Sequence, residues 1–249
     1  MNTLGNNNKH THLATLAYSA GRVCLALALV FTLSVMGGVV QAAPLAATAP
    51  KLGSASSFAV LANAAVTCTD GTITGDVGTF LATPTGSVTR TSCPITGTVH
   101  VGDGVATQAF NNFLSTYAAL APKPGDVCTT LTGTLAGVTL SPGVYCFDAA
   151  ATLTGKLTLK GPSNGIWIFK IGTSGTGALT GTNFSVVMAD GGQAGNVYWW
   201  VAEAATMTDS NFVGTILAGT AITLTRGTFD GNAWSKADVT ITGTNLVGK

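Results

Sequence analysis

The sequence predicts an all-β solenoid, and two observations support this prediction. Short strand-like segments with glycine at nearly every corner follow one another through most of the chain, for example at residues 131–135, 138–140 and 143–147. In addition, residues 205–246 repeat with a fixed step of seventeen. A sandwich or barrel has no reason to keep a constant spacing, whereas stacked coils do.

The composition agrees with a β-rich fold and narrows the possible partners. The chain has 249 residues, 32 of them glycine, with 8% charged residues and a net charge of +1. Nothing in this balance favours nucleic acid or an anionic membrane surface as a partner. The scarcity of Lys and Glu disfavours long exposed helices. An all-β surface covered by hydroxyl groups fits better.

The repeat also predicts which side chains face the solvent. Each copy has an apolar residue between two threonines, and a further polar residue three positions on. Because side chains alternate along a strand, Met207, Leu224 and Ile241 should point inward and the threonines outward. Coils about 4.8 Å apart, with threonines about 6.7 Å apart along a strand, would form a flat grid of hydroxyl and methyl groups. The predicted binding surface is Thr206, Thr208, Asn211, Thr223, Thr225, Thr228, Thr240, Thr242 and Asn245.

Threonine is a favoured strand residue, so a threonine-rich face can reflect β-propensity alone. Here three registered copies place threonine in two columns that contain no charged residue. An ordinary soluble surface would accept charges at such positions. The columns therefore indicate a binding surface.

The N-terminus reads as a signal peptide, residues 1–42. A polar region with Lys9 and Arg22 leads into an apolar run at residues 23–40, and Val40-Gln41-Ala42 offers a cleavage site. The run is close to spanning length, so a retained membrane anchor is the alternative. Removal predicts a protein that is secreted or periplasmic and has no membrane contact after cleavage. A monomer is the default expectation. Residues 43–51 are expected to be a flexible lead-in.

Export makes the remaining cysteines candidates for disulfides. Cys68, Cys93, Cys128 and Cys146 remain, an even number in an oxidising compartment. Three pairings are possible, and pairing nearest neighbours needs the fewest topological assumptions. A zinc site is the rival interpretation, but the remaining chain has no Cys-x-x-Cys pair and one histidine, His100. We expect no metal and no cofactor.

Residues 52–249 are expected to form a single domain with one helix at about 103–121. Asp103 is a suitable N-cap, an apolar stripe from Ala106 to Leu120 follows at helical spacing, and Pro122 ends the helix. The polar side of this helix carries no Lys or Arg, so packing against the β-structure is favoured over membrane binding. Residues 79–94 are expected to be an irregular cap, stapled by Cys68 and Cys93.

Six motifs between about Leu52 and Leu246 resemble the microbial ice-binding proteins with a discontinuous β-helix. The motifs are residues 52–62 (LGSASSFAVLA), 73–78 (ITGDVG), 140–145 (LSPGVY), 153–159 (LTGKLTL), 167–172 (WIFKIG) and 212–218 (FVGTILA). The resemblance implies a right-handed β-helix of triangular section with one long α-helix packed alongside it. It also implies that both ends of the chain contribute coils and that one flat face binds ice, inhibiting ice growth and recrystallisation.

The ice-binding face of that family often carries a Thr-(Ala or Gly)-x-(Thr or Asn) motif. Thr180-Gly181-Thr182-Asn183 and Thr242-Gly243-Thr244-Asn245 match it fully, which makes Thr180, Thr182 and Asn183 a possible extension of the surface. Two other copies have Asp209 and Arg226 at the second position. A charge there would hold its own hydration shell beside the face.

Two rival functions come from other classes. Polysaccharide-cleaving enzymes also use right-handed β-helices, but they need clustered carboxylates, and the acids here are scattered without a recurring spacing. We expect no catalytic residues and no enzyme activity. A secreted carbohydrate-binding or adhesion module would use exposed aromatic residues, for which Tyr198, Trp199, Trp200 and Trp234 are the candidates. The alternative for Trp234 is burial under the helix.

Overall fold

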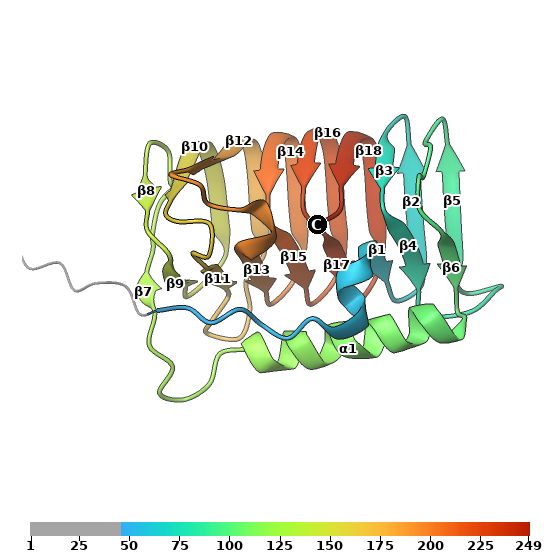
Figure 1. Ribbon diagram of the computed structural model, residues 1–249, viewed down its shortest axis with the longest axis horizontal. Coiled ribbons are helices and arrows are strands. Elements are labelled where there is room, and N and C mark those ends of the chain that lie inside the picture. Colours follow the sequence, from blue (N-terminus) through green and yellow to red (C-terminus); the bar gives the residue numbers. More distant parts are fainter. Residues whose placement is uncertain (1–45) are drawn as a thin grey trace, which may run out of the picture. The chain divides into compact units, whose positions relative to one another are not determined.

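The chain folds into a right-handed parallel β-helix of triangular section. One α-helix, α1, lies along its side (Figure 1). The computed structural model describes residues 46–249. Its helical elements are η1 (Gly53–Ser57), α1 (Gly104–Leu120) and η2 (Ala194–Asn196). Its strands are β1 (Phe58–Ala62), β2 (Ala65–Thr69), β3 (Thr72–Thr74), β4 (Asp76–Thr79), β5 (Ser87–Thr91), β6 (Val99–Val101), β7 (Thr129–Thr130), β8 (Thr139–Leu140), β9 (Gly143–Phe147), β10 (Ala151–Lys160), β11 (Trp167–Ile171), β12 (Leu179–Ala189), β13 (Val197–Val201), β14 (Ala205–Val213), β15 (Thr215–Ala218), β16 (Ile222–Asp230), β17 (Ala233–Ser235) and β18 (Val239–Val247).

Two parallel sheets hold the coils together, and their strand order does not follow the chain. One sheet runs β6-β4-β1-β17-β15-β13-β11-β9-β7 and the other β5-β2-β18-β16-β14-β12-β10-β8, with β3 also paired to β18. The N-terminal strands therefore stack on the C-terminal coil, with Val239 opposite Val66 and Val60 opposite Ala233. This confirms the predicted discontinuous solenoid.

The long strands of the second sheet bend in the middle, and the bend produces two sides of the triangle. In β14 the burial alternates until Thr208; Asp209 is then also exposed, and Ser210 points inward. Asp209 has φ 51° and Arg226 has φ 57°, a left-handed conformation that turns an extended strand. Register at the predicted step of seventeen is kept across the bend, with Thr206 opposite Thr223 and Asn211 opposite Thr228.

The inside of the solenoid is filled by apolar side chains stacked from coil to coil. Met207, Leu224 and Ile241 are buried there, as predicted from the alternation. Aromatic rings continue the stacking, with the Phe169 and Trp199 ring centroids 3.9 Å apart. Since each inward side chain lies on its counterpart one coil away, the core is continuous along the axis.

Helix α1 covers the outer side of the first sheet. The Asp103 carboxylate caps it by accepting a 2.8 Å hydrogen bond from the Ala106 amide. Phe113 packs edge-on against Trp234, and the Trp200 indole donates a 3.0 Å hydrogen bond to the Tyr117 carbonyl. A second buried cluster therefore lies between helix and sheet, and the apolar stripe predicted from the sequence is the surface that forms it.

Two segments expected to be irregular or flexible are more ordered than the sequence suggested. Within residues 79–94, β5 pairs in parallel register with β2, so the middle of that stretch is a regular strand with irregular residues on both sides. In the expected flexible lead-in, the Lys51 carbonyl accepts a 2.7 Å hydrogen bond from the Thr116 hydroxyl and Ala47 packs on the helix cluster. Sequence patterns missed both because the partners are distant in the chain.

The predicted signal peptide lies outside the described residues. Within residues 46–249, no helix is long and apolar enough to cross a membrane.

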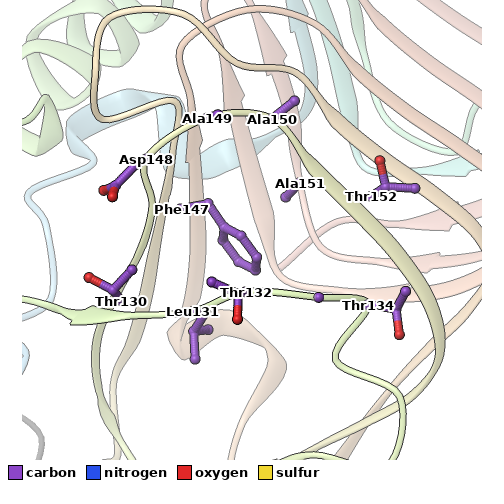
Figure 2. Close-up of a pocket in the computed structure, with 11 residues that line it drawn as sticks. Thr130, Leu131, Thr132, Thr134, Phe147, Asp148, Ala149, Ala150, Ala151 and Thr152 are labelled. Atoms are coloured by element: carbon purple, nitrogen blue, oxygen red, sulfur yellow. The ribbon is translucent and has the colours of Figure 1, made fainter.

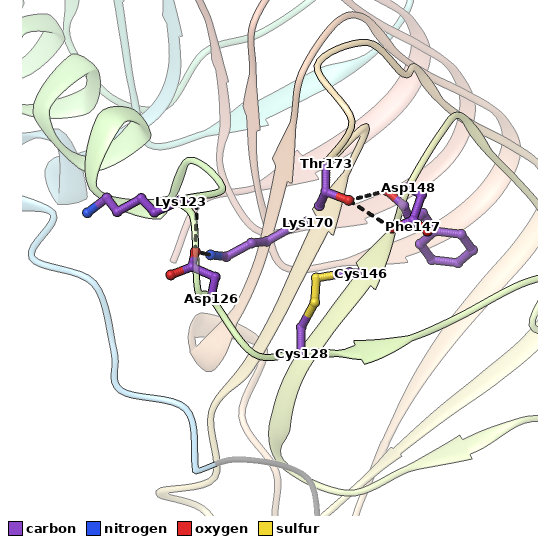
Figure 3. Close-up of a disulfide and its surroundings, with 8 residues drawn as sticks. All are labelled: Lys123, Asp126, Cys128, Cys146, Phe147, Asp148, Lys170 and Thr173. Carbon is purple, nitrogen blue, oxygen red and sulfur yellow. Dashed lines mark hydrogen bonds and ion pairs between the residues drawn. A yellow bond between two sulfur atoms is a disulfide. The ribbon is translucent and has the colours of Figure 1, made fainter.

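Both nearest-neighbour disulfides are present. The Cα atoms of Cys68 and Cys93 are 5.8 Å apart, and those of Cys128 and Cys146 are 5.9 Å apart. The second disulfide fastens the segment after α1 to β9 (Figure 3). Nearby, the Lys170 ammonium donates a 2.7 Å hydrogen bond to Asp126 and thereby holds the pKa of that carboxyl below its ordinary value. The zinc alternative is excluded for these four cysteines.

We expect the paired substitution Cys128→Ser and Cys146→Ser to lower the free energy of unfolding by about 3 kcal/mol, because the unfolded chain regains the entropy of an open loop. Chemical denaturation of the two proteins measures the difference. Under reducing conditions the two proteins should become equally stable, and a difference that persists there would contradict this explanation.

Candidate functional site

The first threonine column runs almost the full length of the solenoid. It lies on the outward side of the first half of the bent strands, before the corner. Every residue in it is a threonine, from β5 at one end to β10 at the other. The pairing register aligns Thr89, Thr67, Thr240, Thr223, Thr206, Thr180 and Thr152.

A second column lies beside the first, two residues further along each strand. It aligns Thr91, Thr69, Thr242, Thr225, Thr208 and Thr182. Together we call these two columns the threonine face. All of its residues are partly or fully exposed, and α1 lies on the other sheet. No charged residue stands in either column.

The sequence predicted the central part of this face and missed its ends. The predicted Thr206, Thr223 and Thr240 and their column-two partners are brought together, and the possible extension Thr180 and Thr182 joins them. The missed residues are Thr67, Thr69, Thr89, Thr91 and Thr152. Each belongs to a Thr-x-Thr sequence, so the signal was present. The fixed step of seventeen could not find Thr67, Thr69, Thr89 and Thr91 because the N-terminal coils stack on β18, outside chain order. It could not find Thr152 because the step from Thr152 to its partner Thr180 is longer than seventeen.

The predicted third column does not share the plane of the other two. Asn211, Thr228 and Asn245 are in register with one another but follow the corner, so they lie on the adjoining side. They also bond along the axis: the Thr228 hydroxyl donates to the Asn211 side-chain oxygen at 2.8 Å. The sequence treated the strand as straight, and the left-handed residue at the corner corrects that expectation.

The corner also corrects the assignment of Asn183. Thr180 aligns with Thr206 rather than Thr208, so the full match of residues 180–183 to the family motif is displaced by two residues. Asn183 has φ 48° and takes the corner position, while Ser185 aligns with Asn211.

Short-range bonds stiffen the corner beside the second column. The Ser210 hydroxyl donates a 2.9 Å hydrogen bond to the Thr208 carbonyl and accepts one of 3.2 Å from the Phe184 amide. At Gly227 a Cβ atom would lie 2.1 Å from the Ser210 carbonyl oxygen, so glycine is required there. The strand therefore turns at a fixed place in neighbouring coils, which keeps the threonine face regular.

Asp209 and Arg226 occupy consecutive corner positions and form an ion pair with each other. The guanidinium Nη2 donates to one carboxylate oxygen at 2.7 Å, and Nε donates to the other. This contact from Arg226 lowers the pKa of Asp209. The charges suspected from the sequence are thus present at the edge of the face, but each has a partner.

A recess at the β7 end of the solenoid is the candidate place for catalysis. It has a volume of about 500 Å³ and is bounded by residues 130–134 and 147–152 (Figure 2). Its lining contains one carboxylate, Asp148, which accepts a 3.0 Å hydrogen bond from the Thr173 hydroxyl. A pair of carboxylates for acid and base chemistry is missing from this lining. Among residues 46–249, no group of three or more His, Cys, Asp or Glu side chains could hold a metal ion.

The aromatic candidates for sugar binding are buried. Trp199 points into the solenoid core, whereas Tyr198, Trp200 and Trp234 point outward under helix α1. Their exposed fractions are 0% for Trp199 and Trp234, 4% for Tyr198 and 5% for Trp200. They leave no aromatic platform on which a sugar could stack, and burial of Trp234 under the helix agrees with the alternative considered from the sequence.

Solved structures share this architecture. An ice-binding protein from the Antarctic ascomycete Antarctomyces psychrotrophicus is 32% identical, with a TM-score of 0.71, and the match covers 80% of this chain and 98% of that one. An ice-binding protein from an Antarctic biological consortium is 31% identical, with a TM-score of 0.73, and the match covers 82% of this chain and 92% of that one.

Sequence comparisons point to the same group. An ice-binding protein from Nostoc sp. (strain HG1) is 39% identical over 73% of this chain, and the match spans 66% of that protein, just under two thirds of its length. Ice-binding protein K1-A of Typhula ishikariensis is 33% identical over 70% of this chain and 79% of its own length. The family is named for binding and not for catalysis, in agreement with the prediction that the chain is no enzyme. Since the family model described as "Ice-binding-like" matches residues 60–247, the chain belongs to the ice-binding-like family.

Proposed function

We propose that this protein binds ice through the threonine face and thereby inhibits ice growth and recrystallisation. The observation that carries the proposal is the pair of continuous threonine columns with no charge in either. Similar proteins that carry the name ice-binding protein support it.

The chemistry of the face suits water that is already arranged as in a crystal. Each threonine offers one methyl group and one hydroxyl group, and the hydroxyl both donates and accepts hydrogen bonds. Spacings of about 4.8 Å between coils and about 6.7 Å along a strand repeat over the whole grid. Surface water held at such regular positions can join the lattice without being removed first.

The rigidity of the threonine face also contributes to the affinity for ice. A single water-mediated contact is weak, so binding must come from many contacts that form together. Threonine is β-branched and stiff about χ1, and the parallel ladders fix the backbone on which it stands. Little conformational freedom is lost on adsorption, and protein anchored at intervals blocks the growth of the crystal between its anchors.

The proposed contact surface has a centre and an edge. The two threonine columns form the centre, including Thr180, Thr182 and the N-terminal threonines. Asn211, Thr228 and Asn245 form an edge around the corner, and Asn183 belongs to that corner. The proposed surface therefore includes every residue predicted from the sequence, with some in the plane of the threonine face and the others around the corner.

The same proposal includes an exported monomer that carries no cofactor. Residues 1–42 would act as a signal peptide and be removed, giving a secreted or periplasmic protein. The two disulfides support passage through an oxidising compartment.

Ice-affinity partition of the purified protein, with recrystallisation followed in the same sample, tests the function directly. We expect the protein to concentrate in a slowly growing ice fraction and to keep small crystals small. Exclusion from the ice fraction would refute the proposal.

The substitution Thr225→Tyr should abolish most ice capture while leaving the melting temperature nearly unchanged. Thr225 stands in the middle of the second column, and its side chain is partly exposed, so the larger ring would project from the face and disturb its flatness. The fraction of protein captured by ice is the measurement. Full capture of a folded Thr225→Tyr variant would show that the binding site lies elsewhere on the protein.

The matched control is Gln108→Tyr on the exposed side of helix α1, which lies on the other sheet. This variant introduces the same ring and should retain the capture of the unmodified protein.

Thr89→Tyr tests whether the surface extends to the N-terminal coils. Thr89 stands at the β5 end of the first column, two coils beyond Thr240. We expect a smaller loss of capture than for Thr225→Tyr, because one end of the grid is disturbed and the centre remains flat. Unchanged capture would show that the contact surface ends before β5.

A further inference from the structure

Asp209 and Arg226 are charged residues beside the central coils of the threonine face, the coils of β14 and β16. Asp209 directly follows Thr208, and Arg226 directly follows Thr225, so each charge begins one residue from the second column. In the two adjoining coils the same corner position holds Asn183 and Gly243, which are neutral, and one coil beyond Gly243 it holds Asp70, directly after Thr69. The backbone conformation therefore does not require a charged residue at this position.

The two charges meet as a bidentate pair along the solenoid axis. Both carboxylate oxygens of Asp209 accept from the guanidinium of Arg226, at 2.5 and 2.7 Å. Two parallel bonds fix the orientation of the guanidinium as well as its distance. Both side chains remain well exposed, at 40% for Asp209 and 59% for Arg226, so water reaches the pair from outside.

An unpaired charge beside the central coils, at Asp209 or Arg226, would interfere with a face that works through ordered water. An isolated carboxylate or guanidinium orients several waters around itself, and their arrangement follows the charge rather than a crystal lattice. When the two groups bond to each other, much of that hydration is replaced by the contact between them. The flexible arginine side chain is also held along the corner instead of sweeping across the column.

We propose that the Asp209–Arg226 pair is a positioning element of the ice-binding surface: each residue acts by neutralising and fixing the other, so that neither disturbs the water over the second threonine column. The proposal rests on the proposed function and concerns the edge of the same face. The proposal predicts that direct contact between the pair and ice adds little to the affinity. The main contribution of the pair is that it leaves no free charge beside the second column.

Three variants separate these effects. Asp209→Asn leaves a free guanidinium, Arg226→Asn leaves a free carboxylate, and the double variant Asp209→Asn with Arg226→Asn has neither. Asparagine tolerates the left-handed conformation and already occupies it at Asn183, so the backbone is expected to keep its corner. Thermal melting of each variant verifies that it is folded.

We expect each single variant to lose most of its capture by ice at neutral pH, and the double variant to recover the capture of the unmodified protein. Recovery of capture by the double variant distinguishes charge neutralisation from a structural role of the bond. If the bond were needed for the fold, the double variant would be captured by ice no better than the single variants. Lys160→Asn is the matched control: it leaves Asp190 without its partner at 3.5 Å, on the segment beyond the corner, and should not change capture.

Two outcomes would overturn the proposal: single variants captured as well as the unmodified protein, or a folded double variant captured no better than the singles. These outcomes are distinct from failure of the ice-binding function itself, which would appear as exclusion of the unmodified protein from ice in the same experiment.

Discussion

Parallel pairing between β18 and β2 is the contact on which the rest of this structure depends. It joins two parts of the chain that are far apart in sequence, with Thr240 opposite Thr67 and Thr242 opposite Thr69. The Asp238 carboxylate reinforces the junction by accepting a 2.9 Å hydrogen bond from the Ala65 amide. A slip of one residue here would turn the N-terminal threonines into the core and end both columns at β18.

The first sheet contributes to stability by packing against helix α1, and the second sheet carries the proposed binding surface. The first sheet is apolar on its inner side and also where helix α1 covers its outer side, over residues such as Trp234 and Leu217. The second sheet is apolar only on its inner side, and its outer side is left to threonine. Burying the aromatic residues under the helix removes them from the surface, and the exposed grid can then be uniform in both size and charge.

Much of the fold and the centre of the site followed from local pattern. The repeat around Met207, Leu224 and Ile241 predicted stacked coils and the direction of each side chain, because alternation along a strand is a property of the backbone. The helix from Asp103 was recognisable for the same reason, since a cap and an apolar stripe are local. Pairing of Cys68 with Cys93 and of Cys128 with Cys146 followed from proximity along the chain.

The sequence by itself thus determined the period, the inward and outward sides, the helix and the threonines at the centre of the face. Only the tertiary structure decided that Thr67 and Thr89 extend the same column, because that register is set by contacts between distant segments. It also decided that Asn211 lies around a corner, since the left-handed conformation of Asp209 leaves no clear mark in the order of residues. Local periodicity specifies how one coil is built; where coils meet and where they turn is fixed by their packing on one another.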